Sequence, residues 1–243
     1  MFVEKILPYI IVIICAYLIG SFSPSYIISR IKKVDLKKTA TRNLGASNAT
    51  VVLGWKFGVL VAVVDIAKGA AAVLLTRFLA PELPAIAYAA GAAVILGHIF
   101  PFYLKFRGGK GFATYIGAIA GLNFPVAVVL AVAIIALALI TNYLVVGTFI
   151  TIISYPVFLL FFYENKFCAA IMAIPSMVVL FKHHENIVRI QHGTEGKVRA
   201  LFGKGHREKA EKERKELDAM EEAREEAKKA AKEKKEGNAG EAE

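Results

Sequence analysis

Long apolar runs separated by short polar segments dominate the chain between residues 6 and 181. A run of about 20 apolar residues is long enough to cross a bilayer as a helix. The runs cover residues 6–31, 51–79, 84–104, 112–140, 143–163 and 167–181. The run at 112–140 is too long for one helix, and Gly, Asn and Pro within 121–125 divide it into a short helix and a full one. The pattern therefore predicts an all-α, polytopic membrane protein with about seven transmembrane helices.

Composition supports this fold class. The chain of 243 residues is 56% hydrophobic and has a mean hydropathy of +0.53, which excludes an ordinary soluble domain. The first apolar run lacks a clean small-residue cleavage site, so we expect a retained helix rather than a removed signal peptide. Cys15 and Cys168 both lie in apolar runs and are expected to pack there, without a disulfide or metal role.

The net charge of +10 is unevenly placed. Basic residues gather at 30–42, at 105–110 and after 181, whereas the connections between these segments are nearly free of them. Positive charge marks the cytoplasmic side of a membrane protein. We therefore expect the N-terminus outside and the basic loops and C-terminus in the cytoplasm, an alternation that requires the run at 112–140 to be divided.

The composition changes to Ala, Glu, Lys and Arg from residue 204 onward, with nearly equal numbers of acidic and basic residues. These residues favour helix and form i,i+4 pairs, but they present almost no apolar face for packing. The chain is therefore divided into a transmembrane domain at 1–203 and a charged tail at 204–243, which is expected to be a solvated or disordered helix.

Glycines and cations meet in the segment 97–114, GHIFPFYLKFRGGKGFAT. Gly108, Gly109 and Gly111 surround Lys110 and allow backbone N–H groups to approach an anion, and Lys105 adds a second cation. The segment is not a nucleotide-binding P-loop, because a Gly rather than Ser or Thr follows the Lys. It predicts a phosphate site at the membrane surface, although a basic turn that obeys the positive-inside rule is the alternative.

Two further polar clusters fall on the same side. The loop with Arg42, Asn43, Gly45, Ser47 and Asn48 suits anion binding, or else it is a loop that ends with Ser47 or Asn48 as a helix N-cap.

The second of these clusters contains His183 and Asn186, which share one helical face. An imidazole at the interface can act as a general base toward a hydroxyl, whereas the alternative is a helix end stabilised by basic residues. A zinc site formed by His183, His184 and His192 is disfavoured because sequence neighbours point to different faces and no cysteine supports them.

Polar residues also occur inside the apolar runs. Asp65 and Lys68 are three residues apart and are expected to form an ion pair, and His98 lies near the end of the third run. Ser21 belongs to a group of small residues that interrupts the first run, where it serves either close helix packing or the site.

Taken in order, these motifs resemble the bacterial acyl-phosphate–glycerol-3-phosphate acyltransferase family, the PlsY type, over about residues 10–200. The matching segments are Gly20-Ser21, Asn43 to Asn48, Asp65 to Gly69, Gly97 to Thr114, His183 to Arg189 and Gly193-Thr194-Glu195. The resemblance implies seven transmembrane helices and a cytoplasmic active site in a bacterial plasma membrane. It implies transfer of a fatty acyl group from acyl phosphate to glycerol 3-phosphate, giving lysophosphatidate and phosphate. The implied partners are these substrates and membrane lipid, with no cofactor, metal or nucleic acid.

The resemblance also implies residue roles. His183 and Asn186 act at the reacting hydroxyl, with Ser21 nearby. Glycerol 3-phosphate is held by Lys105, Gly108, Gly109, Lys110 and Gly111. Acyl phosphate is held by Arg42, Asn43, Gly45, Ser47 and Asn48.

Two other functions fit parts of the chain. A small transporter or channel for an anionic solute would use Asp65, Lys68 and His98 within the membrane. A transporter needs polar residues on both sides, whereas here they gather on one, which favours the enzyme. A scaffold acting through the charged tail would leave the glycine-rich loop unexplained.

Overall fold

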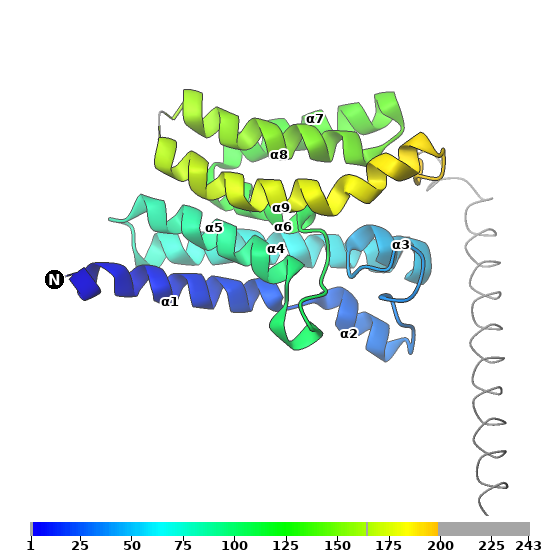
Figure 1. Ribbon diagram of the computed structural model, residues 1–243, viewed down its shortest axis with the longest axis horizontal. Coiled ribbons are helices and arrows are strands. Elements are labelled where there is room, and N and C mark those ends of the chain that lie inside the picture. Colours follow the sequence, from blue (N-terminus) through cyan, green and yellow to red (C-terminus); the bar gives the residue numbers. More distant parts are fainter. Residues whose placement is uncertain (1, 164, 199–243) are drawn as a thin grey trace, which may run out of the picture. The chain divides into compact units, whose positions relative to one another are not determined.

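The computed structural model describes residues 2–163 and 165–198. The predicted tail at 204–243, and with it the proposed domain boundary, lies outside these residues. The described elements are all helical (Figure 1): α1 Phe2–Ser21, α2 Pro24–Ile31, α3 Ala46–Leu53, α4 Trp55–Leu79, α5 Pro84–Ile99, the 3-10 turn η1 Phe102–Leu104, α6 Phe112–Leu122, α7 Phe124–Thr141, α8 Leu144–Phe161 and α9 Lys166–Gln191.

Six segments of the described chain are long and apolar enough to cross a membrane. They are Leu7–Ile31, Trp55–Leu79, Pro84–Leu104, Phe124–Thr141, Leu144–Phe161 and Lys166–Gln191. The seventh apolar segment is α6, which has 11 residues and is too short to cross alone. The all-α membrane fold is confirmed, and the division of the run at 112–140 falls at Asn123, between α6 and α7.

Two predicted helices are broken by local chemistry. The first run separates into α1 and α2 because Ser23 caps α2, accepting a hydrogen bond from the Tyr26 N–H at 3.3 Å, and Pro24 starts that helix. The second run starts later than residue 51, because Gly54 adopts φ +97° and separates α3 from α4.

The last predicted helix, 167–181, was wrong at its C-terminal end. Helix α9 continues to Gln191, and His183 and Asn186 share one face of it, as their spacing predicted. Both side chains are buried, and the neighbouring His184 and Glu185 are exposed. This extension is amphipathic rather than uniformly apolar, which is why a search for apolar runs ended too early.

Close backbone contacts hold the bundle together. Helix α4 packs most extensively on α6, and α1 on α5. At the α4–α6 contact, a methyl group on Gly69 would collide with the Thr114 carbonyl, and one on Gly117 with the Ile66 carbonyl. Small residues allow such approach where lipid supplies no hydrophobic force between helices.

The outer faces are strongly apolar. Val129 on α7 and Phe161 on α8 are 67% and 69% exposed. Exposing so large an apolar surface to water would be unfavourable, and the surface is typical of one that contacts lipid acyl chains.

Candidate active site

The glycine-rich loop is pinned to the end of α5. The N–H groups of Gly108 and Gly109 donate to the carbonyls of Ile99 and His98 at 3.0 and 3.2 Å. Gly109 lies directly on the His98 ring, with no room for a Cβ atom. Gly111 has φ +93° and starts α6, so the loop leads directly into a helix N-terminus.

The first loop, residues 32–48 from the end of α2 into the first turn of α3, contacts the glycine-rich loop, residues 105–111 between η1 and α6. The Leu44 N–H donates to the Gly108 carbonyl at 3.3 Å, and the Ser25 hydroxyl donates to the Leu44 carbonyl at 2.7 Å. The Lys37 ammonium donates to the Leu104 carbonyl at 3.3 Å. Two segments more than 60 residues apart are thus joined by hydrogen bonds.

Two asparagines of the first loop shape its backbone. Asn48 is fully buried, and its amide group donates to the carbonyls of Leu36 and Asn43, both at 2.8 Å. Its side-chain oxygen accepts from the Thr41 N–H at 3.0 Å. The Asn43 side-chain oxygen accepts from the Gly45 N–H at 3.0 Å. Both side chains are therefore engaged within the loop.

Other residues of the first loop face outward. Arg42 and Ser47 are exposed, and Gly45 is half-buried. The N-cap of α3 is Gly45 and has no side-chain capping bond, so the alternative in which Ser47 or Asn48 caps this helix is wrong. The first N–H groups of α3 lack intrahelical partners and lie beside Ser47.

A polar network joins the glycine-rich loop to α9. The Lys110 ammonium donates to the side-chain oxygen of Asn186. The Asn186 amide donates to Glu195 at 2.8 Å, and the other Glu195 oxygen accepts from Arg189 Nε at 2.7 Å. Glu195 reaches back because the chain folds at Gly193, where φ is +69°. Glu195 and Arg189 had no predicted role, although the resemblance included both.

His183 lies beside this network on α9. Its side chain is buried between Phe112 and Phe149, with ring centroids 6.4 and 6.3 Å away, both edge-on. Its Nδ1–H donates to the Val179 carbonyl at 2.8 Å. Since a carbonyl only accepts, the proton of the neutral ring sits on Nδ1, and Nε2 presents a lone pair.

Burial lowers the pKa of Lys110 to about 8, and the nearby Arg189 charge acts in the same direction. Glu185 and Glu195 oppose the shift but do not cancel it. The Lys110 ammonium is thus partly desolvated, and pairing with an anionic ligand would stabilise its charged form.

Ser21 and Lys105 lie outside the network of Lys110, Asn186 and Glu195. The buried Ser21 hydroxyl donates to the Tyr17 carbonyl at 2.9 Å, at the end of α1. Lys105 is exposed and lies near Lys37, whose pKa is lowered mainly by burial and further by the charges of Arg107 and Lys105.

Beneath the loop, Asp65, Lys68 and His98 form a buried cluster. One Asp65 oxygen lies 2.8 Å from Lys68 Nζ and 3.2 Å from His98 Nδ1, which confirms the expected ion pair and adds the histidine. Lys68 also donates to the Phe22 carbonyl at 2.7 Å, at the break between α1 and α2. The cluster thus ties α1, α4 and α5 together directly under Gly109.

Comparison with known proteins identifies the family. A family model described as glycerol-3-phosphate acyltransferase matches residues 10–193. A glycerol-3-phosphate acyltransferase of Bartonella henselae is 36% identical over 191 residues, covering 77% of this chain and 90% of the relative. One of Coxiella burnetii is 35% identical over 192 residues, covering 79% and 98%.

Solved structures agree. The chain is similar to a crystal structure of PlsY, an integral membrane glycerol 3-phosphate acyltransferase, in its glycerol 3-phosphate form, with a TM-score of 0.73 and 30% identity over 78% of this chain and 94% of that one. The lysophosphatidic acid form of PlsY gives a TM-score of 0.70 and 29% identity with the same coverage. These relatives are enzymes rather than transporters, and the chain belongs to the PlsY family of integral membrane glycerol-3-phosphate acyltransferases.

Proposed function

We propose that this protein transfers a fatty acyl group from acyl phosphate to the 1-hydroxyl of glycerol 3-phosphate, giving lysophosphatidate and phosphate. One observation carries the assignment of roles. Lys110 of the glycine-rich loop contacts Asn186, one helical turn from His183 on α9. An anion site and a potential general base therefore lie next to each other.

The glycine-rich loop is the proposed site for the phosphate of glycerol 3-phosphate. Lys110 supplies the positive charge, and Gly108, Gly109 and Gly111 have no side chains, so the phosphate can approach the backbone N–H groups closely. The N-terminus of α6, which directly follows Gly111, adds the positive end of a helix dipole. The exposed Lys105 is assigned to the outer edge of this site, where it attracts the substrate.

The first loop is the proposed site for acyl phosphate. Arg42 and Ser47 are exposed and can donate to the phosphate, with Gly45 and the N-terminus of α3 supplying backbone N–H groups. Asn43 and Asn48 contribute by holding the loop in shape, because their side chains are already bonded to its backbone.

The chemistry requires little beyond placement, since acyl phosphate is already an activated donor. His183 Nε2 takes the proton of the 1-hydroxyl, and the oxygen attacks the acyl carbonyl carbon. The bond between that carbon and the phosphate oxygen then breaks, and phosphate leaves with the electron pair and takes up the proton. Asn186 is assigned to the hydroxyl, and Arg42 to the charge on the departing phosphate. Ser21 is assigned to support the site from the end of α1.

The positive-inside rule supports an orientation with the active site and C-terminus in the cytoplasm and the N-terminus outside, in a bacterial plasma membrane. This orientation requires the chain to cross the membrane at the short helix α6 as well as at the six longer spans. The family match at 10–193 supports a catalytic domain within 1–203, with 204–243 dispensable for acyl transfer.

Purified full-length protein in lipid should release phosphate and lysophosphatidate in equal amounts from palmitoyl phosphate and glycerol 3-phosphate. The donor is tested by replacing palmitoyl phosphate with a palmitoyl thioester at the same concentration. Product from the thioester but none from the acyl phosphate would overturn the proposed donor. Inactivity with both in folded protein would overturn the proposed reaction.

The lowered pKa of Lys110 predicts a pH dependence. Only the charged form binds the substrate phosphate well, and with a pKa of about 8 roughly one tenth of it remains charged at pH 9. The KM for glycerol 3-phosphate should therefore rise about tenfold between pH 7 and pH 9. Lys110→Arg keeps its charge over this range and should flatten the rise. An equally steep rise in that variant would assign the titration to another group.

A further inference from the structure

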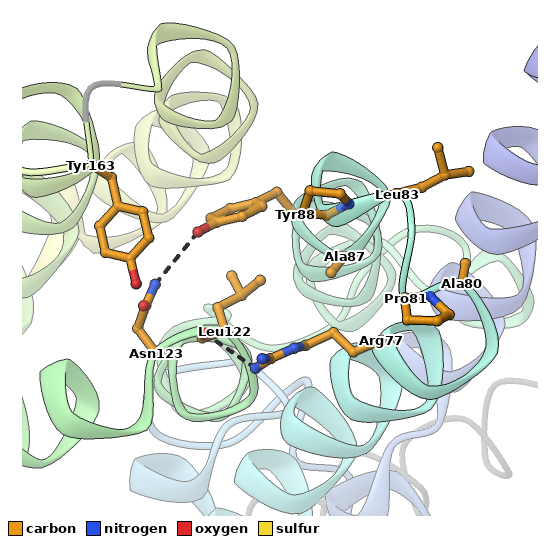
Figure 2. Close-up of a pocket in the computed structure, with 10 residues that line it drawn as sticks. Arg77, Ala80, Pro81, Leu83, Ala87, Tyr88, Leu122, Asn123 and Tyr163 are labelled. Atoms are coloured by element: carbon orange, nitrogen blue, oxygen red, sulfur yellow. Dashed lines mark hydrogen bonds between the residues drawn. The ribbon is translucent and has the colours of Figure 1, made fainter.

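A pocket opens at the end of the bundle opposite the glycine-rich loop, and Figure 2 shows its lining. Helix α5 begins at this pocket with Pro84 and ends at the glycine-rich loop, so its 16 residues, a length of about 24 Å, separate the two sites. The cavity has a volume of about 320 Å³, which is large enough for a small polar ligand. Its lining includes Arg77, Pro81, Leu83, Tyr88, Asn123 and Tyr163. We call it the Arg77 pocket.

Arg77 is held in place with donors to spare. Its Nη1 atom donates to the carbonyls of Gly121 and Leu122 at 2.7 and 3.3 Å, capping the end of α6. Both of its hydrogen bonds within the described residues come from this one nitrogen, which leaves Nε and Nη2 for a ligand. None of the described residues that line the pocket is acidic. A guanidinium that pairs with no carboxylate among the described residues favours phosphate, which its planar fork matches.

Neutral donors stand opposite this charge. Asn123 donates to the hydroxyls of Tyr155 and Tyr88 at 3.1 and 3.5 Å, and because Tyr88 accepts there, its own proton remains available to a ligand. Figure 2 shows the hydroxyl groups of Tyr88 and Tyr163 both directed toward Asn123. Helices α5 and α7 begin at the pocket and α4 and α6 end there, so the positive and negative helix ends offset one another and the attraction for an anion comes from Arg77.

The surroundings of the pocket select a lipid over a free anion. Helix α4 and the segment Pro84–Leu104, which begins with α5, both have spanning length and are joined at 80–83, so the pocket lies at headgroup depth. Next to Arg77 on α4, Phe78 and Leu79 are 81% and 69% exposed and offer apolar surface to an acyl chain. Leu83 and Tyr163 at the pocket are also exposed, which is typical of residues at the membrane interface.

We propose that the Arg77 pocket binds the phosphate of an anionic phospholipid from the membrane leaflet opposite the glycine-rich loop. Arg77 holds the phosphate, Tyr88 and Tyr163 donate to headgroup oxygens, and an acyl chain lies along Phe78 and Leu79. The site is separate from the acyl-transfer site and does not depend on the function proposed for it.

The test is a titration of purified full-length protein in detergent with phosphatidylglycerol, followed by thermal stability or native mass spectrometry. Arg77→Gln removes the positive charge but keeps an N–H donor for the carbonyls at the C-terminal end of α6. It should weaken binding about tenfold or more, because a hydrogen bond to a charged group is lost. Arg30→Gln removes an exposed arginine on α2 and should change binding less than twofold. Acyl transfer by Arg77→Gln should stay within twofold of the unaltered protein.

Parallel titrations with phosphatidylcholine and inorganic phosphate distinguish the sources of phosphate. Weaker binding of phosphatidylcholine, and no competition by millimolar phosphate, would support the anionic lipid. The proposal would be overturned if inorganic phosphate bound in an Arg77-dependent way and phosphatidylglycerol did not displace it. It would also be overturned if Arg30→Gln weakened phosphatidylglycerol binding as much as Arg77→Gln does. If Arg77→Gln does not fold, Ala80→Trp provides a second variant, because it fills the pocket and retains the arginine. It should weaken phosphatidylglycerol binding about tenfold as well. Unchanged binding in this variant would contradict the proposal.

Discussion

Replacing His183 with alanine is expected to lower kcat for acyl transfer by about 10²- to 10⁴-fold, the usual contribution of a positioned general base. The expectation rests on the His183 ring, whose Nδ1–H bond to the Val179 carbonyl leaves Nε2 as the basic atom. Its burial between Phe112 and Phe149 fixes the direction of that lone pair. The KM for glycerol 3-phosphate should change much less, because Lys110 and the loop backbone remain.

The matched control is His184→Ala. His184 is adjacent in sequence but exposed, since neighbours on a helix point to different faces. Its removal should leave kcat within twofold. Measurement of initial phosphate release at saturating substrate separates the two variants. If the His183 variant retained more than a tenth of the activity in folded protein, the proton would have to go elsewhere, and His183 would lose its proposed role.

Replacing Asp65 with asparagine is expected to lower the free energy of unfolding by about 3–5 kcal/mol. The change keeps the size of the side chain and removes its charge. Lys68 and Asp65 have side chains only 6% and 1% exposed, so the Lys68 ammonium would stay buried without its carboxylate. Breaking one partner of a buried pair is costly for this reason. Because the cluster lies under Gly109, the glycine-rich loop should loosen as well.

Asp35→Asn provides the control for Asp65→Asn. Asp35 pairs with Lys38 at 3.8 Å, and both side chains are largely exposed, so its loss should cost about 0–1 kcal/mol. Unfolding of both variants in mixed micelles of increasing denaturing detergent measures the difference. Equal unfolding midpoints for the two variants would contradict the prediction and would mean that water or neighbouring groups compensate the buried Lys68 charge. The double variant Asp65→Asn, Lys68→Met should recover part of the loss, since it no longer buries an unpaired charge.

Much of the architecture follows from local sequence. Spanning helices need long apolar runs, so six spans and the short α6 could be predicted with ends correct to within a few residues at most boundaries. The breaks at Gly54 and Asn123 involve residue types that end helices, although the start of α4 was missed. The Asp65–Lys68 pair was also predictable, because i,i+3 spacing on a helix brings two side chains together whatever surrounds them.

The C-terminal end of α9 could not be read from apolar runs. Beyond Phe181 the chain becomes polar on one face. The spacing of His183 and Asn186 indicated a helical turn there, but only the structure shows that the same helix continues to Gln191. Glu195 was missed as a contact of Asn186 for a related reason. A carboxylate nine residues away is not on the same helical face, and it reaches Asn186 only because the chain reverses at Gly193.

The sequence by itself determined the fold class, the helices and the chemical types of the three polar clusters, since each depends on residues close together in the chain. Only the tertiary structure decided how the clusters meet: Leu44 on Gly108, Lys110 on Asn186, and His98 under Gly109. It also decided that Asn43 and Asn48 hold the first loop in shape, and it formed the Arg77 pocket from helices distant in sequence. The physical reason is that such contacts depend on how helices pack across long sequence separations, which local periodicity does not encode.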